Sequence, residues 1–357
     1  MLETFTQRAA GLARRLLPLL GLAATHAALA APAGQAEHAT PRQLEIADYR
    51  AYLAEQHPVR QGMRKFAEEV AAASGAGLRV TVRTDALPGS PAQQLAALQA
   101  GSAGAPALML VAGTGLAPLE PGFTLLDLPF LVRDEAQADA LLDGAFGTAL
   151  LGRLAPSGLV GLAWWENGFR HITTSKGPVR GAQDLRGLKI RVINEPVFAE
   201  TFEAFGATPV PLPFGELRSA LAAGRVDAQD NFISQILAGR LHEVQSSLSL
   251  TRHSYSPLVL VAQAGTWNSL TGKQQRVLRA AALEAGRVQR AAARAEAKSA
   301  QEALAGLGLR VITFAPAELA RLQALSAPLR ARYFDRYGKE LRPLYQAATQ
   351  AAAGQAR

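Results

Sequence analysis

Short, wholly apolar runs alternate along this chain with segments whose apolar residues recur at helical spacing. Residues 107–111 and 159–165 are almost entirely apolar, which is typical of strands buried on both faces of a parallel sheet. From Val59 to Val70, apolar side chains recur at intervals of four, three and four, as they do on one face of a helix. This alternation of buried strands and amphipathic helices predicts an α/β fold.

The same criteria predict the remaining elements. Extended segments are predicted at 78–82, 188–192, 209–212 and, as a brief edge, at 226–228. Helices are predicted at 90–101, 134–155, 196–205 and 214–223. The longest helix is predicted from Thr271, a good N-cap residue, to about Ala305. A helix of about 35 residues would span roughly 50 Å, which is long enough to run across two domains.

The N-terminal segment has the pattern of a secretion signal rather than of a folded element. Three arginines precede a mostly apolar stretch at 16–30, which ends in a small-x-small cleavage sequence, Ala-Leu-Ala, at 28–30. That stretch is shorter than the roughly 20 residues of a membrane span. We therefore predict a signal peptide at 1–30, a linker at 31–43 and an exported, periplasmic protein. General secretion and twin-arginine export both remain open, as does an uncleaved N-terminal helix.

Composition excludes several classes of protein. Apolar residues make up 49% and charged residues 18% of the 357, which excludes disorder as a description of the whole chain. The absence of cysteine excludes disulfides, thiolate metal sites and cysteine nucleophiles. The net charge is +8, but residues 270–357 hold 15 basic and only 6 acidic side chains. Without interleaved aromatic residues, this stretch indicates a solvated, arginine-rich helix surface rather than a nucleic-acid site.

Catalytic motifs are scarce. None of the six histidines lies four residues from another, and HExxH, GxSxG, Walker and GxGxxG sequences do not occur. The sequence Gly113-Thr114-Gly115 lacks the third glycine of a dinucleotide-binding loop. We therefore predict no catalytic residues, no metal site and no cofactor. A periplasmic enzyme on the same fold stays open as a less favoured alternative.

The most informative block runs from 164 to 255 and contains five linked motifs. They are Trp-Glu-Asn-Gly-Phe-Arg (165–170), Gly-Leu-Lys-Ile-Arg-Val (187–192), Pro-Phe-Gly-Glu-Leu (213–217), Asp-Ala-Gln-Asp-Asn (227–231) and Leu-Thr-Arg-His (250–253). In order and spacing, the series resembles the solute-binding proteins of tripartite ATP-independent periplasmic (TRAP) transporters, of the C4-dicarboxylate-binding (DctP-like) type. The resemblance covers about 57–300.

This resemblance implies a two-lobed periplasmic solute-binding fold with a ligand cleft between the lobes and a long helix that spans both. Lobe I is expected at 44–167 plus 256–295, lobe II at 168–255 plus 296–345, and a tail at 346–357. The implied function is to capture a small organic acid and deliver it to the small and large permease subunits in the membrane. A ligand-binding sensor subunit is the main alternative. The acid is left open among C4-dicarboxylates, sugar acids and 2-oxo acids, and a monomer is expected.

The resemblance also implies roles for individual residues. The ligand carboxylate would pair with Arg191, with four further contacts from residues whose counterparts line the cleft in the family: Arg170, Asn194, Phe214 and Asn231. Two residues would hold the arginine from behind, on the side away from the ligand: Asp230 and His253. The sequence departs from the family pattern in having Ala228 in place of glycine and Asp230 in place of glutamate.

The residues alone support a weaker form of the same hypothesis. Arg191 lies in a strand of alternating apolar residues, where an unpaired charge is costly. Its planar guanidinium matches a carboxylate in two-point geometry. The partner is left open between a ligand and an internal carboxylate, either Asp227 or Asp230. Trp164 and Trp165 are expected to be core residues.

Overall fold

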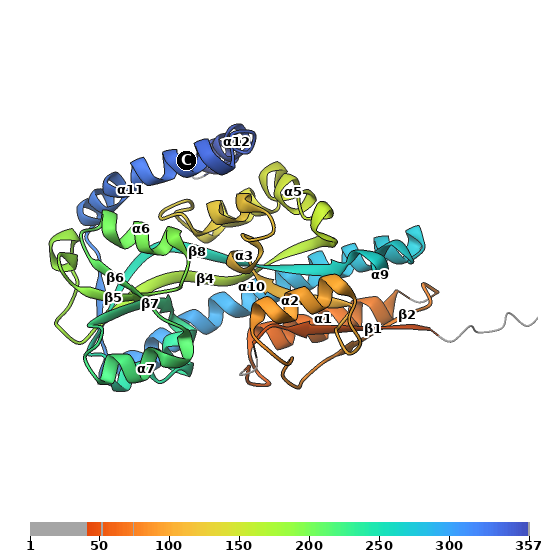
Figure 1. Ribbon diagram of the computed structural model, residues 1–357, viewed down its shortest axis with the longest axis horizontal. Helices are drawn as coiled ribbons and strands as arrows, with labels where there is room; N and C mark the ends of the chain where they lie inside the picture. Colours follow the sequence, from red (N-terminus) through yellow and green to blue (C-terminus); the bar gives the residue numbers. More distant parts are fainter. Residues whose placement is uncertain (1–40, 51–52, 74, 356–357) are drawn as a thin grey trace, which may run out of the picture. The chain divides into compact units, whose positions relative to one another are not determined.

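The computed structural model describes residues 41–50, 53–73 and 75–355 of the chain (Figure 1). The predicted signal peptide and most of the predicted linker lie outside these residues. Within the described part, nine strands form one mixed sheet in the order β2-β1-β3-β8-β4-β7-β5-β6, and β9 pairs with β8. Strands and helices alternate along the chain, which confirms the α/β prediction.

The elements have the following bounds. The strands are β1 (Arg42–Asp48), β2 (Leu78–Val82), β3 (Leu108–Ala112), β4 (Leu159–Thr174), β5 (Lys189–Val192), β6 (Thr208–Pro211), β7 (Ala228–Phe232), β8 (Ser247–Gln263) and β9 (Arg310–Thr313). The helices are α1 (Pro58–Ala72), α2 (Pro91–Ala100), α3 (Gly113–Leu116), α4 (Glu135–Leu142), α5 (Ala145–Gly152), α6 (Pro196–Ala204), α7 (Phe214–Ala222), α8 (Ile233–Ala238), α9 (Ala264–Asn268), α10 (Gly272–Gly306), α11 (Pro316–Tyr337) and α12 (Arg342–Gln355). A 3-10 segment, η1, covers Pro121–Asp127.

Two long antiparallel strands, β4 and β8, connect the two ends of the sheet. They have 16 and 17 residues, and β8 pairs with β3 while β4 pairs with β7. Parallel strands β1, β2 and β3 lie on one side of this pair, and parallel strands β5, β6 and β7 lie on the other. The β4–β8 register shifts between Glu166 and Gly168 and again between Arg170 and Ile172. The pair therefore bends between two groups of parallel strands, as a two-lobed arrangement requires.

The long helix was predicted correctly. α10 has 35 residues, and the Thr271 hydroxyl accepts a hydrogen bond from the Gln274 N–H at 3.2 Å. Small residues let α10 approach β4 closely, and the indole N–H of Trp165 donates to the Ala282 carbonyl at 3.2 Å. The Gln289 side chain bonds both the N–H and the C=O of Glu166, at 2.8 and 2.7 Å. The helix is thereby fixed to β4 at the point where that strand changes register.

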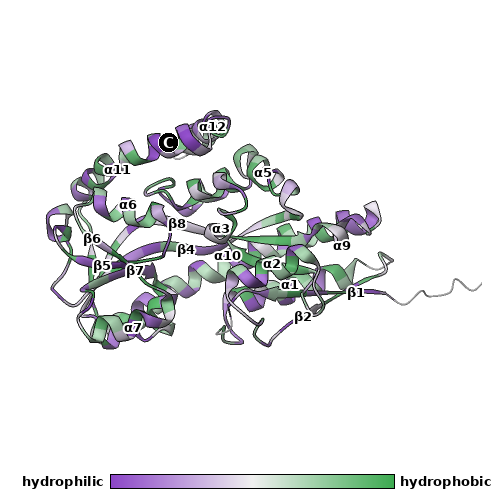
Figure 2. Cartoon of the chain, in the orientation of Figure 1, coloured by the Kyte–Doolittle hydropathy of each residue, from purple (hydrophilic) through white to green (hydrophobic). Residues whose placement is uncertain are grey.

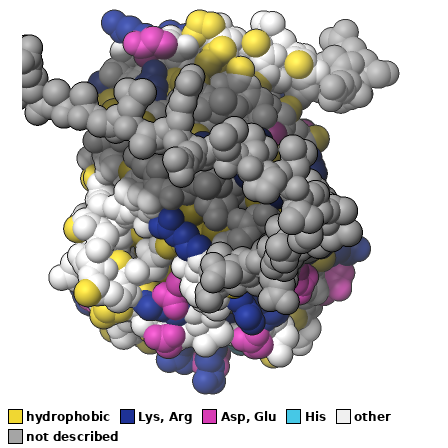
Figure 3. All heavy atoms as spheres, turned by 90° about the vertical axis from the view of Figure 1, so that its right-hand side faces the viewer, with side chains coloured by type: hydrophobic (Ala, Val, Ile, Leu, Met, Phe, Trp, Pro, Cys, Tyr) yellow, Lys and Arg dark blue, Asp and Glu magenta, His cyan; other side chains and the backbone are white. Residues whose placement is uncertain are grey.

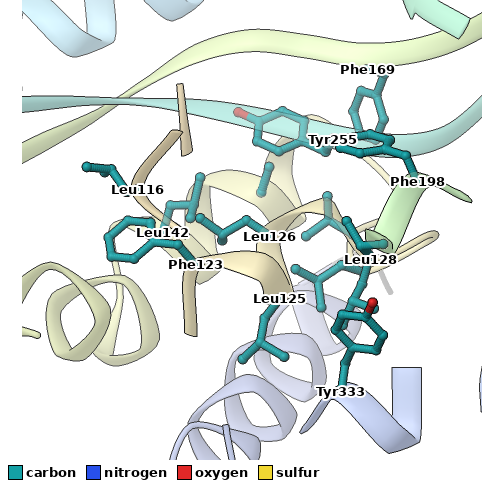
Figure 4. Packing of buried hydrophobic residues seen from close by; sticks show 14 of the residues in the cluster. Leu116, Phe123, Leu125, Leu126, Leu128, Leu142, Phe169, Phe198, Tyr255 and Tyr333 are labelled. Atoms are coloured by element: carbon teal, nitrogen blue, oxygen red, sulfur yellow. The ribbon is translucent and has the colours of Figure 1, made fainter. Parts of the chain in front are cut away.

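A large apolar cluster packs on one side of the sheet (Figure 4). Figure 4 shows leucines of η1, such as Leu125 and Leu126, between aromatic residues of the strands, including Phe169, and Tyr333 of α11. Trp164 belongs to this cluster, whereas Trp165 packs in a second cluster against α1 and α10. The prediction that both tryptophans are core residues is confirmed.

Two predicted elements were wrong in detail. The helix predicted at 134–155 is two helices, α4 and α5, which break around Gly144. After the break the chain returns so closely that a Cβ on Gly147 would lie 1.8 Å from the Leu142 carbonyl oxygen. The brief edge predicted at 226–228 is instead β7, an inner strand between β4 and β5.

The polar composition of β7 explains that error. Its residues Gln229, Asp230 and Asn231 are nearly completely buried, although such side chains are depleted from strands. Figure 2 shows hydrophilic colour along this part of the sheet. A buried polar strand must find partners for its side chains, and these partners define the site described below.

Elements at both ends of the described chain were not predicted. β1 begins at Arg42, inside the predicted linker, and residues of the predicted tail form most of α12. None of the helices in the described ranges combines the length and apolarity of a membrane span. Basic side chains of the C-terminal helices are partly neutralised at the surface by ion pairs such as Arg332–Glu200 and Arg342–Asp335. Figure 3 shows one face on which basic and acidic side chains lie intermixed in the lower part.

Candidate functional site

All five residues predicted to contact a ligand line one cavity of about 760 Å³. They come from three strands, from the segment after one of them and from the start of one helix: Arg170 (β4), Arg191 (β5), Asn194 (after β5), Phe214 (start of α7) and Asn231 (β7). A volume of this size is typical of small-molecule sites.

The position of the cavity follows from the topology. Residues 193–195 follow β5, 212–214 follow β6 and 235 follows β7, so one wall is made at the carboxyl ends of one group of parallel strands. Residues 49–50 follow β1 and 114–115 follow β3, which places the other wall at the carboxyl ends of the second group. Open α/β sheets bind ligands at this edge of their strands. The cavity is therefore lined from both halves of the sheet.

Arg191 is buried, and its guanidinium is only partly occupied. Its Nε–H donates to the Leu212 carbonyl at 2.9 Å, and no hydrogen bond from its two terminal nitrogens to a described residue is seen. Neither Asp227 nor Asp230 forms an ion pair with it; Asp227 pairs with Lys176 instead. Burial lowers the pKa of Arg191 to about 10, so the side chain remains cationic at neutral pH. It thus presents a charged fork to the cavity without an ion-pair partner among the described residues.

Arg170, in contrast, is held by the protein. Its Nε–H donates to Asp230 Oδ2 at 2.5 Å and its Nη2 donates to the Asp230 carbonyl at 2.8 Å. The rings of Phe198 and Phe232 lie 5.2 and 4.9 Å from the centre of the guanidinium. These contacts fix the orientation of the guanidinium group, and Nη1 is the nitrogen that makes no hydrogen bond to a described residue.

Asp230 and His253 form the support that holds Arg170, rather than Arg191. Asp230 Oδ2 also lies 3.3 Å from His253 Nε2, and His253 Nδ1 lies 2.8 Å from the Thr251 hydroxyl. Burial alone would raise the pKa of Asp230, but the Arg170 charge and the hydrogen bonds from His253 and Arg170 hold it well below its ordinary value. Because this carboxylate accepts only, Nε2 carries the histidine proton and Nδ1 accepts from Thr251. The aspartate is therefore long enough for the supporting role despite replacing glutamate.

A third carboxyl group, that of Asp127, lies in the same charged neighbourhood. Burial raises the pKa of Asp127 to about 8, although the Arg170 charge opposes this. At neutral pH the group is mostly protonated and contributes little charge. The buried set Arg170, Arg191, Asp127 and Asp230 therefore carries about one net positive charge, which suits an anionic ligand.

Asn231 and Phe214 complete the wall around the arginines. Asn231 is 4% exposed, and its Oδ1 accepts a hydrogen bond from the Phe232 N–H at 3.1 Å. With the oxygen occupied in this way, the amide nitrogen is the group of Asn231 that can donate to a ligand. Phe214 is the first residue of α7 and contributes an apolar surface to the cavity. Asn194 is exposed at the cavity rim.

Several cavity residues were not predicted from the sequence: Tyr49, Arg50, Ser90, Thr114 and Glu195. Arg50 donates to Asp48 Oδ1 and to Asn167 Oδ1, both at 2.9 Å. The missing signal was β1 itself, since its recognition would have placed Tyr49 and Arg50 at a carboxyl strand end. Thr114 lies in the glycine sequence that was examined for dinucleotide binding; it begins the one-turn helix α3.

Among the residues that the structure describes, no group of three or more histidine, cysteine or carboxylate side chains is arranged to hold a metal ion. The groups around the cavity are instead hydrogen-bond donors, one acidic side chain and apolar walls. Such an arrangement can bind and orient a small anion.

Similarity to known proteins agrees with this geometry. The family described as "Bacterial extracellular solute-binding protein, family 7" matches residues 50–336. The 2,3-diketo-L-gulonate-binding periplasmic protein YiaO of Escherichia coli is 41% identical over 197 residues, which cover 55% of this chain and 60% of that protein. The chain thus spans less than two thirds of this relative's length in the match.

Two solved structures match over nearly their whole length. A TRAP periplasmic solute-binding protein from Ochrobactrum anthropi has a TM-score of 0.82 and 34% identity, over 88% of this chain and 97% of its own. The sugar acid binding protein DctPAm from Advenella mimigardefordensis, in complex with galactonate, has a TM-score of 0.76 and 32% identity, over 87% and 99%. These similarities confirm the two-lobed solute-binding fold predicted from the motif series.

Proposed function

Because the chain belongs to family 7 of the bacterial extracellular solute-binding proteins, the DctP-like family of TRAP transporters, we propose that it captures a small organic acid through an arginine–carboxylate clamp. The family consists of periplasmic binding proteins rather than enzymes, so the enzyme alternative is set aside. One observation carries the proposal: Arg191 and Arg170 are buried at the wall of one cavity, and Arg191 has no ion-pair partner among the described residues.

Arg191 and Arg170 have different roles in binding the ligand carboxylate. Arg191 presents to the carboxylate its two terminal nitrogens, which bond no described residue, and Arg170 adds a donor whose direction Asp230 fixes. The Asn231 amide supplies a further donor to the ligand, and Phe214 covers its apolar face. Arg170, Arg191 and Asn231 are buried, so a bound carboxylate exchanges its hydrating water molecules for these fixed hydrogen-bond donors. The attraction between the carboxylate and the two guanidinium charges is stronger at such a buried site than in water.

Glu195 narrows the class of acid. It is the one acidic side chain among the described residues that line the cavity, and burial raises its pKa above the ordinary value. A carboxylate accepts hydrogen bonds from ligand hydroxyls but repels a second ligand carboxylate. We therefore propose a hydroxylated monocarboxylic acid, such as a sugar acid, rather than a C4-dicarboxylate. This choice is supported by relatives that bind 2,3-diketo-L-gulonate and galactonate.

A thermal-shift screen tests the function. Galactonate, glucuronate, 2,3-diketogulonate and succinate are compared at equal concentration with the uncharged sugar galactose. A ligand at 100 times its dissociation constant stabilises the folded protein by about 2.7 kcal/mol, which gives a clear rise in melting temperature. A rise with at least one acid and none with galactose supports the proposal. Equal responses to acids and to the neutral sugar would contradict it.

The Glu195→Gln variant should lose selectivity rather than fold stability. Removing the charge relieves repulsion of a second carboxylate, so we expect succinate to bind about tenfold more tightly relative to galactonate than it does in the wild type. Isothermal titration calorimetry measures both affinities. Glu200→Gln is the matched control, because Glu200 lies on α6 and pairs with Arg332 outside the cavity. An unchanged succinate-to-galactonate ratio would remove Glu195 from the selectivity argument.

Delivery to the membrane subunits requires two conformations that the small and large permease subunits can distinguish. We propose that lobe I (44–167 plus 256–295) and lobe II (168–255 plus 296–345) close on the ligand by bending β4 and β8 near their register shifts. The cavity wall receives residues from both groups of strands, so a ligand gains its full contacts only when the groups are close. Small-angle scattering should show a smaller radius of gyration with saturating acid, and an unchanged radius would contradict closure.

We also propose that the chain is exported and cleaved after Ala30. The predicted signal peptide has its positive residues before an apolar stretch and a small-x-small end. The expected result is a mature periplasmic chain beginning at Ala31, as determined by N-terminal sequencing. A chain that retains Met1 and sediments with membranes would rule out cleavage.

A further inference from the structure

A second cavity, of about 330 Å³, lies where α11 and α12 face the loop that precedes α4. Two arginines line it, Arg133 and Arg330, together with uncharged groups that include Gln137, Gln323 and Tyr345. Among the described residues, no acidic side chain lines this cavity. It shares no lining residue with the ligand cavity.

Neither arginine forms an ion pair with a described residue. Arg330 donates through Nη1 to the Pro129 carbonyl at 3.1 Å and to the Ser326 hydroxyl at 2.8 Å, and through Nη2 to the Gln323 carbonyl at 3.3 Å. All three acceptors are uncharged. Burial lowers the pKa of Arg330, since no carboxylate compensates for it. Arg133 has only a long contact from its Nε to Gln137 Oε1, at 3.4 Å.

The acidic residues nearby are committed to other partners. Asp134 caps α4 by accepting from the Gln137 N–H at 2.8 Å, and Glu135 accepts from Arg252 at 2.9 Å. Asp139 pairs with Arg290 and Arg294 of α10. Among the described residues, no carboxylate of α4 forms an ion pair with either arginine of the second cavity.

Arg133 and Arg330 line the cavity together with Tyr345. Burial raises the pKa of Tyr345, and the positive charges of Arg330 and Arg133 oppose this rise. The Tyr345 hydroxyl donates its proton to the Leu131 carbonyl at 2.8 Å. Its oxygen can therefore act only as a hydrogen-bond acceptor for other groups. Arg330 is half-buried and Arg133 is exposed at the cavity, so an anion bound between them would be attracted by both charges.

The floor of this cavity is also strained. Phe130, which lines it, has a φ of 53°, a backbone conformation that residues other than glycine rarely adopt. The Phe130 N–H donates to the His253 carbonyl at 2.7 Å, and this bond holds the conformation. Backbone strain of this kind is concentrated at ligand clamps and similar sites. The backbone conformation of Phe130 and the two arginines are independent features of the same cavity, and both are typical of a ligand site.

We propose that this cavity is a second anion site, which binds a small oxyanion through Arg133 and Arg330. The volume is within the range of small-molecule sites but is less than half that of the ligand cavity. Guanidinium groups bind carboxylate and phosphate oxygens in the same two-point geometry. The shared chemistry is therefore a compact anion with several oxygens, either phosphate or a small polycarboxylate.

Calorimetric titration with inorganic phosphate and, separately, with citrate tests this site. The double variant Arg133→Gln/Arg330→Gln should bind the recognised anion at least about tenfold more weakly than wild type, since two charge-assisted bonds are lost. Arg332→Gln is the matched control, because it removes the same charge from the same helix, outside the cavity. If phosphate binds and citrate does not, the ligand of this site is an inorganic anion. If citrate binds and phosphate does not, the ligand is a polycarboxylate.

An Arg191→Ala background separates this site from the ligand cavity. The Arg191→Ala variant should bind the anion as the wild type does. Replacing Arg133 and Arg330 in this variant as well should abolish that binding. If the glutamine pair does not unfold cooperatively, the lysine pair Arg133→Lys/Arg330→Lys keeps the charge and should weaken binding less. Absence of binding by both anions, equal affinity in the double variant, or loss in the Arg191→Ala background would each overturn the proposal.

Discussion

Replacing Arg191 with alanine should abolish most of the affinity for the organic acid while leaving the protein folded. In the wild type the ligand carboxylate would meet two terminal guanidinium nitrogens that have no other partner among the described residues. In the variant the anion would enter a buried site without this counter-charge. Truncating one partner of a buried, hydrogen-bonded charge pair costs about 2–5 kcal/mol, which corresponds to a loss of about 30-fold to several thousandfold in affinity.

The conservative variant distinguishes charge from geometry. Arg191→Lys keeps a positive charge but loses the planar fork, and we expect binding about ten- to a hundredfold weaker than in the wild type. Arg186→Ala is the control, because Arg186 is exposed just before β5 and does not line the cavity. Calorimetry with the best acid from the screen gives the order wild type, lysine, alanine. If Arg191→Ala folds normally and binds that acid as tightly as the wild type, the clamp assignment is wrong.

The parts of this fold that were predicted from the sequence are those with local, periodic signals. The stripe from Val59 to Val70 is buried as expected, and the Thr271 cap begins α10 where it was predicted. These features depend on neighbours three or four residues away, so a single sequence contains the necessary information. The break at Gly144 depends instead on a close return of the chain, which no local pattern reveals.

The candidate site divides in the same way. The five predicted ligand residues were found because motifs mark them, and they line one cavity. The contribution of the other strand group was missed because Tyr49 and Arg50 follow a strand, β1, that was not predicted. Which arginine Asp230 supports was also beyond the sequence, since Arg170 and Arg191 lie on strands that flank β7 on opposite sides.

Replacing Asp230 should destabilise the whole domain. Asp230 is fully buried on an inner strand, and its carboxylate is the ion-pair partner of Arg170, which is itself 2% exposed. Removing one member of a buried pair leaves an uncompensated charge and is destabilising by about 3–5 kcal/mol. We expect Asp230→Ala to lose this amount of unfolding free energy in urea denaturation. Asp335→Asn, at an exposed pair with Arg342, should change it by less than about 1 kcal/mol.

The pH dependence of Asp230→Asn adds a readout that a packing defect would not give. The pKa of Asp230 in the folded protein lies below that of an unfolded aspartate, because the Arg170 and His253 contacts outweigh burial. The ionised group therefore stabilises the fold above the unfolded pKa of about 3.9, and this stability is lost as the pH falls toward the folded value. The difference in unfolding free energy between wild type and Asp230→Asn should be constant from about pH 5 to 8 and should shrink in more acidic solution. A difference that is independent of pH down to acid unfolding would mean that Asp230 acts through its shape and not through its charge.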